Sequence, residues 1–291
     1  MKKACIDIGS NSIVLLIGEV KDGKIVELEH QSEVTRLGFK VTETKRFNEE
    51  RMSESEKVIN RFLSSIEKHG VDKDNVFITA TEASRKAQNS AEFFDRFNIK
   101  VDIISGDEEA RLCSLGASSL FPSDFGPITM ADIGGMSTEV IVFERSMDKI
   151  DHSFMESFPI GVVKGTELGT ELNDYLEDLF SEKVDKVKNN QLLLTAGSMT
   201  ALASVLVGDQ EIEPEKINGL LLTPEFITEK IKTLIPLGKE KIVKTYPQLA
   251  SRKDSIVSGM KILLFLLYKI QPEEVIFSTY GLRHGVLLDS I

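Results

Sequence analysis

The chain has 291 residues, and its 35 Lys and Arg against 46 Asp and Glu give a net charge of −11. That length suggests two domains, each long enough to bury a core of its own. Hydrophobic residues make up 41% and charged residues 28%, which is typical of a soluble globular protein. The acidic balance argues against non-specific binding to nucleic acid or membranes, which requires a broad basic field. To bind a polyanionic ligand, the protein would need local Lys or Arg side chains, backbone N–H groups or a metal ion that offset its overall negative charge.

The two cysteines, Cys5 and Cys113, are too few for a disulfide framework and do not form a CxxC pair. We therefore expect both to be small, buried hydrophobic residues of a protein in a reducing compartment. No signal peptide is expected, because Asp7 and Asn11 interrupt the first apolar run. The longest later apolar run, residues 262–268, is far shorter than the ~20 residues that a membrane helix needs. We therefore expect a cytoplasmic protein.

Short strands and helices alternate in the first half of the chain. Strands are expected at 4–8, 13–20, 24–30, 76–80 and 101–104. Helices are expected at 53–68, with Ser53 as the N-terminal cap, at 82–98 and at 107–119. Alternation of this kind predicts an α/β domain.

The opening pattern then returns. Residues 7–12 (DIGSNS) are echoed by residues 132–137 (DIGGMS), an offset of 132 − 7 = 125, and apolar strands follow at 13–20 and 139–143. The shared D-I-G-x-x-S suggests two related halves facing one another, a duplicated α/β domain. Helices are expected further on at 164–189, 199–207, 224–235 and 239–246, and a strand at 192–196. Residues 256–270 are hydrophobic nearly all round, which predicts a buried core helix.

A strand that ends in Asp-x-Gly and turns tightly into another strand suits phosphate binding. Glycine lets the backbone approach a phosphate, the turn N–H groups donate to its oxygens, and the aspartate holds Mg²⁺, usually through water. Two such hairpins facing each other would clamp a phosphate chain between domains. The alternative is that Gly9, Gly134 and Gly135 are ordinary turn glycines and that each aspartate caps a turn.

Eight segments that span the chain carry a resemblance to a known family. They are IDIGSNS (6–12), ATEASRKAQN (80–89), ISGDEEAR (104–111), DIGGMSTE (132–139), PIGVVKGTE (159–167), AGSMT (196–200), RKD (252–254) and GLRHG (281–285). In this order they resemble the exopolyphosphatase/guanosine pentaphosphate phosphohydrolase (Ppx/GppA) phosphatase family, in a short form that ends before the HD-type domain of its long members.

The resemblance implies an α/β, actin-like ATPase fold, the fold of sugar kinases, heat-shock 70 proteins and actin, with two ribonuclease-H-like domains around a cleft. We expect residues 1–120, joined by a C-terminal helix at 281–291, to form the first actin-like domain. Residues 121–280 would form the second.

Site residues follow from the resemblance position by position. It makes Glu109 the base that activates the attacking water and Arg85 the catalytic arginine that contacts a phosphate. Mg²⁺, with Mn²⁺ as an alternative ion, would be held by Asp7, Asp132 and Glu139. Three turns would bind the substrate phosphates through Gly9, Ser10, Asn11, Ser12, Gly134, Gly135, Ser137, Thr138, Gly197, Ser198 and Thr200.

Other interpretations stay open for several of these residues. Glu109 could be a solvated acid in the first turn of a helix, where the helix dipole favours it, and Arg85 could form a surface ion pair. Lys164 and Arg283 match basic family positions but are equally compatible with solvated surface charges. The four histidines show no ligand spacing, so neither a zinc site nor a histidine nucleophile is expected.

Met136 and Met199 stand where the family's phosphate turns carry glycine. Either both side chains point away from the ligand, with the backbone at φ < 0, or they project into the cleft and leave room for fewer phosphates; we favour the second alternative. The leading hypothesis is a Mg²⁺-dependent phosphoanhydride hydrolase that releases terminal phosphate from inorganic polyphosphate or guanosine pentaphosphate. The alternatives are a catalytically weak sensor of polyphosphate or nucleotide, and an actin-like small-molecule kinase. We expect no nucleic-acid or membrane partner, and a homodimer is compatible with the sequence.

Overall fold

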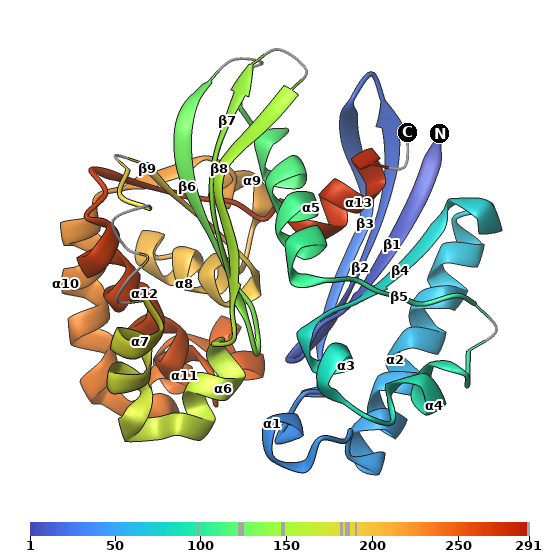
Figure 1. Ribbon diagram of the computed structural model, residues 1–291, viewed down its shortest axis with the longest axis horizontal. Helices are drawn as coiled ribbons and strands as arrows, with labels where there is room; N and C mark the ends of the chain where they lie inside the picture. Colours follow the sequence, from blue (N-terminus) through green and yellow to red (C-terminus); the bar gives the residue numbers. More distant parts are fainter. Residues whose placement is uncertain are drawn as a thin grey trace. The chain divides into compact units, whose positions relative to one another are not determined.

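The computed structural model describes residues 1–97, 99–121, 125–146, 149–180, 183, 187–189 and 191–289. The chain divides into two compact units: unit 1 contains Met1–Ser119 and Leu282–Ile291, and unit 2 contains Leu120–Gly281. Each unit has its own mixed sheet with helices around it, so the predicted α/β class is confirmed. In Figure 1 unit 1 is blue to green with a red C-terminal helix, and unit 2 is green to red.

Unit 1 contains five strands and six α-helices among its described residues: β1 (Lys2–Ile8), β2 (Ser12–Lys21), β3 (Lys24–Val34), β4 (Val76–Ala80), β5 (Asp102–Ile103), α1 (Val41–Thr44), α2 (Glu49–Lys68), α3 (Glu82–Lys86), α4 (Ser90–Phe94), α5 (Gly106–Ser118) and α13 (Leu282–Asp289). The described part of unit 2 contains β6 (Phe125–Ile133), β7 (Thr138–Ser146), β8 (Lys149–Phe158), β9 (Gln191–Thr195), β10 (Leu220–Leu222), β11 (Glu274–Phe277), α6 (Val162–Leu168), α7 (Leu172–Phe180), α8 (Gly197–Val207), α9 (Pro214–Ile217), α10 (Pro224–Leu234), α11 (Gly238–Thr245) and α12 (Ile256–Ile270).

The two sheets share one topology. In unit 1 the strand order is β3-β2-β1-β4-β5, with an antiparallel meander from β1 to β3 and with β4 and β5 parallel to β1. In unit 2 the order β8-β7-β6-β9-β11 repeats this arrangement, and β10 adds an antiparallel strand at the edge. The repeated D-I-G-x-x-S segment begins with the last two residues of a central strand in each sheet, β1 or β6. The structure therefore shows the internal duplication that this repeat predicts.

Two helices of unit 1 differ from the sequence prediction. Helix α2 begins at Glu49 and not at Ser53, because the Asn48 side chain caps it by accepting hydrogen bonds from the backbone N–H groups of Glu50 and Arg51. The helix predicted at 82–98 is two short helices, α3 and α4. Between them the Asn89 side chain accepts from the Phe47 N–H at 2.7 Å, so a tertiary contact interrupts the helix.

The C-terminal helix α13 packs on α5 and β1 of unit 1. A Cβ on Gly285 would lie 1.8 Å from the carbonyl oxygen of Leu112, so only glycine permits this approach of the two helices. Lys3 is fully buried and donates from Nζ to the carbonyl of Leu287 at 3.1 Å. Burial lowers the pKa of Lys3. Arg111 of α5 donates to both carboxylate oxygens of Asp289 at 2.8 and 2.9 Å.

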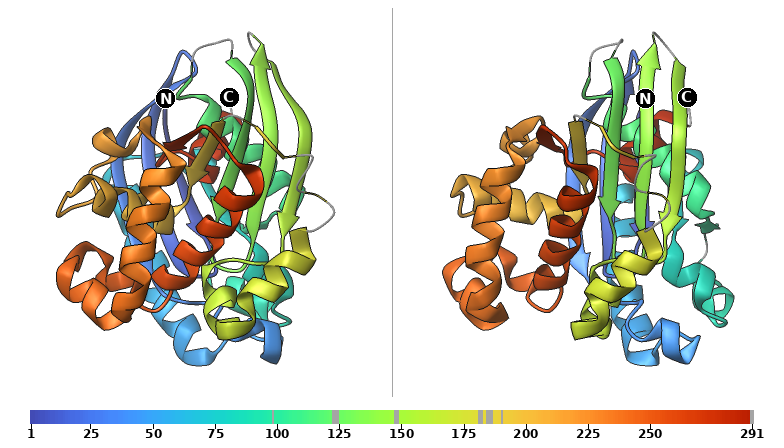
Figure 2. Two further views of the ribbon diagram at one scale, coloured as in Figure 1. Left: turned by 90° about the vertical axis from the view of Figure 1, so that its left-hand side faces the viewer. Right: turned by 60° about the vertical axis from the view of Figure 1, so that its left-hand side comes forward.

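Helix α12 lies in the hydrophobic core of unit 2, where Met260, Ile262 and Leu263 are fully buried, so the predicted core helix is confirmed. Figure 2 shows the orange and red-orange helices α10, α11 and α12 packed together within this unit.

Strand β8 of unit 2 was not predicted from the sequence. The helices predicted at 164–189 are α6 and α7, and the end of this range falls partly outside the described residues. Among the helices in the described ranges, none is both long and apolar enough to cross a bilayer.

Candidate active site

The two repeated turns have the same backbone geometry. The N–H of Gly9 donates to the carbonyl of Ser12 at 3.0 Å, and the N–H of Gly134 donates to the carbonyl of Ser137 at 3.0 Å. A Cβ on Gly9 would lie 2.9 Å from the Ser12 oxygen, and one on Gly134 would lie 3.0 Å from the Ser137 oxygen. Both glycines are therefore required by close approach, as expected of turns in which the backbone binds a ligand. We call residues 9–12 the first loop and residues 134–138 the second loop.

The second loop is held by the start of α6. The N–H of Val162 donates to the carbonyl of Gly134 at 2.9 Å, and the N–H of Val163 donates to the carbonyl of Gly135 at 2.7 Å. A Cβ on Gly161 would lie 2.5 Å from the Gly134 oxygen, so glycine at this position allows the helix to reach the loop. The backbone N–H groups at the helix start are satisfied by the loop carbonyls, which fixes the shape of the loop.

In the second loop, the side chain of Thr138 forms a hydrogen bond within the protein, and Ser137 is buried. The Thr138 hydroxyl donates to the carbonyl of Ile160 at 2.6 Å, and Thr138 is fully buried. Ser137 is 3% exposed. The loop therefore offers backbone groups more readily than the Thr138 side chain to a ligand.

The third predicted turn joins β9 to α8. Ala196 has φ 75° and ψ 158°, a conformation that is almost restricted to glycine and that is concentrated at functional sites. Gly197 follows, and a Cβ there would lie 2.8 Å from Nη2 of Arg252. Ser198 is buried, and the Thr200 hydroxyl donates to the Gly197 carbonyl at 3.1 Å. The turn therefore combines a strained backbone with a nearby guanidinium group.

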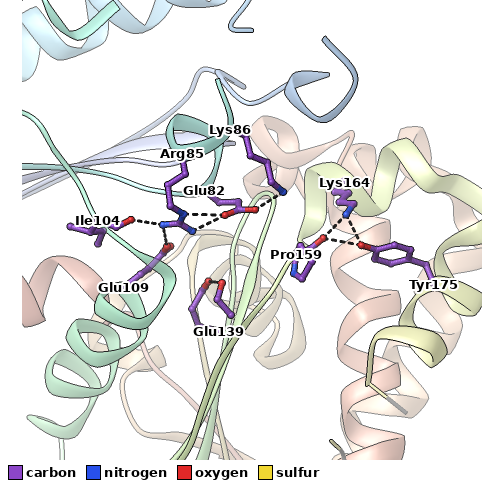
Figure 3. A network of polar contacts seen from close by, with 10 residues as sticks. Glu82, Arg85, Lys86, Ile104, Glu109, Glu139, Pro159, Lys164 and Tyr175 are labelled. Carbon is purple, nitrogen blue, oxygen red and sulfur yellow. Dashed lines mark hydrogen bonds and ion pairs between the residues drawn. The ribbon is translucent and has the colours of Figure 1, made fainter. Parts of the chain in front are cut away.

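Arg85 and Glu109, the two residues predicted to be catalytic, are in direct contact. Nη1 of Arg85 donates to Oε2 of Glu109 at 2.9 Å and to the carbonyl of Ile104 at 2.6 Å. Its Nε and Nη2 donate to Oε2 of Glu82 at 3.1 and 2.9 Å, and the other oxygen of Glu82 pairs with Lys86 at 2.5 Å. Figure 3 shows this network, in which Glu109 is 7% exposed. The buried position excludes the alternative of Glu109 as a solvated first-turn acid.

The network shifts the pKa values of Arg85 and Glu82. Burial disfavours the charge of Arg85, but Glu109 and Glu82 outweigh this and raise the pKa of Arg85. Burial likewise opposes the charge of Glu82, but hydrogen bonds and charge from Lys86 and Arg85 prevail and lower the pKa of Glu82. Arg85 is therefore a fixed cation that Glu82 holds in one orientation against Glu109.

The three predicted metal ligands lie in two different units. In unit 2, Asp132 of β6 and Glu139 of β7 are directly paired across the sheet, and Glu139 is 1% exposed. Glu139 accepts from the Ser157 hydroxyl at 2.7 Å and is labelled in Figure 3. Like charges directly opposite each other are destabilising, so this position favours a cation. In unit 1, Asp7 lies 3.7 Å from Nη1 of Arg283.

The donor chemistry suits Mg²⁺, which prefers oxygen ligands and commonly binds through one or two carboxylates together with substrate phosphates. Among the residues that the structure describes, no group of three or more His, Cys, Asp and Glu side chains could hold a metal ion. Asp132 and Glu139 therefore offer two neighbouring carboxylates, a donor set that fits Mg²⁺.

The prediction that both methionines project into a pocket is wrong for Met199. Met199 is fully buried in the hydrophobic core of unit 2, because it lies on the side of α8 that packs towards α12. Met136 is 1% exposed and has no positive φ. The predicted burial of the two cysteines is confirmed, and neither forms a disulfide. Burial raises the pKa of Cys5 to about 12, so this thiol is inert.

Several residues at these positions received no role from the sequence. Glu82 holds Arg85 in place, and Arg252 lies against Gly197. Both residues stand in segments that carry the family resemblance, 80–89 and 252–254, but neither was assigned a function from the sequence. Burial lowers the pKa of Arg252, which forms no ion pair in the described part of the chain. Lys164 donates to the Pro159 carbonyl and to the Tyr175 hydroxyl, each at 2.6 Å (Figure 3), so it is not a solvated charge.

The chain is similar to curated proteins of known name. It is 31% identical to the bifunctional 3-dehydroquinate synthase/phosphatase of Fusobacterium nucleatum, over 99% of this chain and 46% of that protein. It is 30% identical to exopolyphosphatase 2 of Mycobacterium tuberculosis, over 56% of this chain and 53% of that protein. The chain thus spans about half the length of each of these relatives.

A solved structure and a family model agree with the quoted motifs. The Aquifex aeolicus PPX-GPPA enzyme superposes with a TM-score of 0.80 at 32% identity, covering 99% of each chain. The model of the Ppx/GppA phosphatase family matches residues 16–291. The resemblance seen in the sequence is thereby confirmed, and the chain belongs to the Ppx/GppA phosphatase family.

Proposed function

We propose that this chain is a Mg²⁺-dependent phosphoanhydride hydrolase that releases the terminal phosphate of inorganic polyphosphate. The observation that carries the proposal is the 2.9 Å contact between Arg85 and Glu109, which puts a buried carboxylate beside a fixed guanidinium within one unit. Membership of a phosphatase family and similarity to a protein named exopolyphosphatase 2 support the same class of reaction.

In this proposal Glu109 accepts a proton from a water molecule as the water oxygen forms a bond to the terminal phosphorus. The bond from that phosphorus to the bridging oxygen breaks, and its electron pair stays on the shortened phosphate chain. The remaining Nη2 N–H of Arg85 donates to an oxygen of the transferring phosphate, and the guanidinium charge offsets the charge that develops there. Glu82 keeps the guanidinium in place during this step.

The two glycine-containing loops would supply backbone N–H groups to the phosphate oxygens. Asp132 and Glu139 of unit 2 would hold Mg²⁺ together with waters and phosphate oxygens. Bound there, the ion neutralises phosphate charge and orients the oxygens for displacement.

A substrate panel in the presence of Mg²⁺ tests the function. It should contain long-chain polyphosphate, tripolyphosphate and guanosine pentaphosphate, and released phosphate should be measured without any acceptor. We expect release from polyphosphate. Binding of polyphosphate without release would favour the sensor alternative, and release that requires an added acceptor would favour a kinase.

The metal assignment has its own test. Asp132→Asn removes a negative charge but keeps the size of the side chain, so it should weaken Mg²⁺ binding by about 10–100-fold. Calorimetric titration of Mg²⁺ into the protein with tripolyphosphate measures this directly. Asp151→Asn is a matched control, since Asp151 is a surface residue paired with Lys149 in β8. Equal Mg²⁺ affinities of the two variants would remove Asp132 from the metal site.

A further inference from the structure

Four polar side chains form a row across the sheet of unit 2, at the end where the parallel strands β6 and β9 stop. The directly paired residues are Ser157 with Glu139, Glu139 with Asp132, and Asp132 with Thr195, on β8, β7, β6 and β9. Directly paired residues of neighbouring strands point to the same face of a sheet. The four side chains therefore share one face, and we call them the polar row. Ligands of α/β proteins commonly bind at the carboxyl ends of parallel strands, where this row lies.

Unit 1 repeats the polar row only in part. In the equivalent register of unit 1, Thr79 of β4 is paired with Asp7 of β1, but Val14 of β2 stands where unit 2 has Glu139. The threonine beside the aspartate is thus common to the two halves. The second carboxylate, and with it the like-charge pair that favours a cation, belongs to unit 2.

Thr195 is the last residue of β9, and its side chain is fully buried. Its hydroxyl oxygen has no hydrogen-bond partner among the residues that the structure describes. A buried hydroxyl without a partner costs free energy, and native proteins contain few that are not explained by a bound water, an ion or a function. The lone pairs of a hydroxyl oxygen are suitable for a cation.

Gly281 leaves a space that adjoins both Asp132 and Thr195. A Cβ on Gly281 would lie 3.4 Å from Oδ2 of Asp132 and 4.0 Å from Oγ1 of Thr195. These are ordinary contact distances, and Gly281 is not among the glycines with positive φ, so alanine is compatible with this backbone. All three residues belong to unit 2. The glycine therefore keeps open a small space that a carboxylate oxygen and an unpartnered hydroxyl border.

We propose that the hydroxyl of Thr195 is a third protein oxygen of the Mg²⁺ site, next to the carboxylates of Asp132 and Glu139, and that Gly281 keeps the space for the ion open. This inference rests on the proposed function, since it adds a ligand to the ion assigned there. Mg²⁺ prefers oxygen ligands, and in other phosphate-transfer sites a serine or threonine hydroxyl holds it together with an aspartate.

The polar row supplies a balanced set of groups for such an ion. Two carboxylates and a neutral hydroxyl match the two positive charges of Mg²⁺, and the remaining positions are left to waters and phosphate oxygens. At the other end of the row, Ser157 donates to Oε1 of Glu139 at 2.7 Å and orients that carboxylate. Hydrogen bonds of this kind commonly fix the ligands of a metal site.

The test is the variant Thr195→Val, which removes the hydroxyl and keeps the shape of the side chain. Urea unfolding at a series of Mg²⁺ concentrations and constant ionic strength, with EDTA as the ion-free reference, gives the Kd for Mg²⁺ from the stabilisation by the ion. We expect this Kd to rise about 10-fold in Thr195→Val and to be restored by Thr195→Ser, which again carries a hydroxyl. In EDTA the urea midpoint of Thr195→Val should equal or exceed that of the wild type, because a methyl group replaces an unpartnered buried hydroxyl.

The second variant, Gly281→Ala, acts on the space and leaves both oxygens in place. Its Cβ lies at ordinary contact distances, so the urea midpoint in EDTA should stay the same or rise. The Kd for Mg²⁺ should nevertheless rise by about 10-fold or more, because the methyl group occupies the position beside Asp132 and Thr195. Unchanged or higher stability without the ion, together with weaker binding of the ion, is a result that a purely structural role would not produce.

Thr129→Val in β6 is the matched control, because Thr129 is also fully buried but its hydroxyl donates to the carbonyl of Val187 at 2.8 Å. This variant loses a hydrogen bond, so its urea midpoint in EDTA should fall, while its Kd for Mg²⁺ stays that of the wild type. An equal rise of the Kd in Thr129→Val and Thr195→Val would overturn the proposal, since the effect would then be a general one on the sheet.

Mg²⁺ binding distinguishes this inference from the proposed function, because it needs no turnover. If the wild type releases phosphate from no substrate, the hydrolase proposal fails, and weaker Mg²⁺ binding by Thr195→Val and Gly281→Ala still supports the assignment of Thr195. Wild-type affinity in both variants would overturn that assignment even if Asp132→Asn binds Mg²⁺ more weakly. Absence of any stabilisation of the wild type by Mg²⁺ would overturn it as well.

Discussion

Replacing Gly161 by alanine should displace the second loop, because the new Cβ would lie 2.5 Å from the carbonyl oxygen of Gly134 and 2.5 Å from the carbonyl carbon of Gly135. Ordinary contact requires about 3.5 Å, so the backbone must separate by roughly 1 Å. The hydrogen bonds from Val162 and Val163 to the loop, now 2.9 and 2.7 Å, would then exceed hydrogen-bonding distance. The loop would lose the helix start that holds it.

The free energy of unfolding can be estimated from these contacts. Two lost hydrogen bonds cost about 1 kcal/mol each, and overpacking adds about 1–3 kcal/mol. Alanine lowers the entropy of the unfolded chain, which returns about 0.4–1 kcal/mol, and φ of −150° is allowed for alanine. The net loss should be about 2–5 kcal/mol. Since a 1 Å misplacement of a site can cost ~10²-fold in rate, phosphate release should also fall strongly.

Urea unfolding and phosphate release measure the two effects. Gly126→Ala in β6 is the matched control, since a Cβ there meets no heavy atom within 4 Å and the residue has no positive φ. That variant should stay within ~0.5 kcal/mol of the wild type. If Gly161→Ala unfolds at the same urea concentration as Gly126→Ala and keeps its activity, the helix does not hold the loop as described.

Three further predictions concern single side chains. Glu109→Gln should lower turnover by roughly 10²–10⁴-fold with little effect on substrate binding, whereas Glu108→Gln should change neither; wild-type rates for Glu109→Gln would exclude it as the base. Met199→Ala should reduce the free energy of unfolding by about 2–5 kcal/mol, measured in urea, without changing the preference for long over short polyphosphate, because Met199 is a core residue. Burial lowers the pKa of His284 even though Glu27 partly opposes this, so the unfolded chain takes up a proton on this side chain at higher pH than the folded chain does. Stability should therefore be lost as pH falls from about 6.5 towards 5, by at most ~1.4 kcal/mol per pH unit, and His284→Gln should flatten the urea midpoint over this range.

Sequence patterns predicted the duplicated hairpins well because glycine, aspartate and apolar alternation determine them locally. The strand at β4 was predicted with its observed bounds, Val76–Ala80, and so was helix α12, Ile256–Ile270. Both are short-range patterns: a continuous apolar run, and a segment that is hydrophobic on all sides. Strand β8 was missed because its ten residues, KIDHSFMESF, alternate charged and polar groups with few apolar ones and are mostly half-buried.

Contacts between distant segments could not be predicted in the same way. The break between α3 and α4 depends on Asn89, whose amide pairs with the backbone of Phe47, 42 residues earlier. The direction of the Met199 side chain depends on the packing of α8 towards α12, and a family comparison of turn residues carries no information about that.

The contact of Arg85 with Glu109 could be predicted from the sequence only in part. The two residues are 24 positions apart, on helices that follow the neighbouring parallel strands β4 and β5. Because the carboxyl ends of parallel strands meet at one edge of a sheet, residues at the start of both following helices are brought together. Once the strand order is known, the contact follows from topology, but the orientation of Arg85 by Glu82 still requires side-chain geometry.

The place of α13 has a consequence for the order in which the protein folds during its synthesis. Unit 2 is one continuous segment, Leu120–Gly281, whereas unit 1 is completed by residues that follow it. The buried ammonium group of Lys3 donates to the carbonyl of Leu287, and the backbone of α5 closely approaches α13 at Gly285. Domains that are continuous in sequence can fold as soon as they leave the ribosome. Here residues 1–119 must wait, with part of the face of α5 uncovered, until α13 has been synthesised.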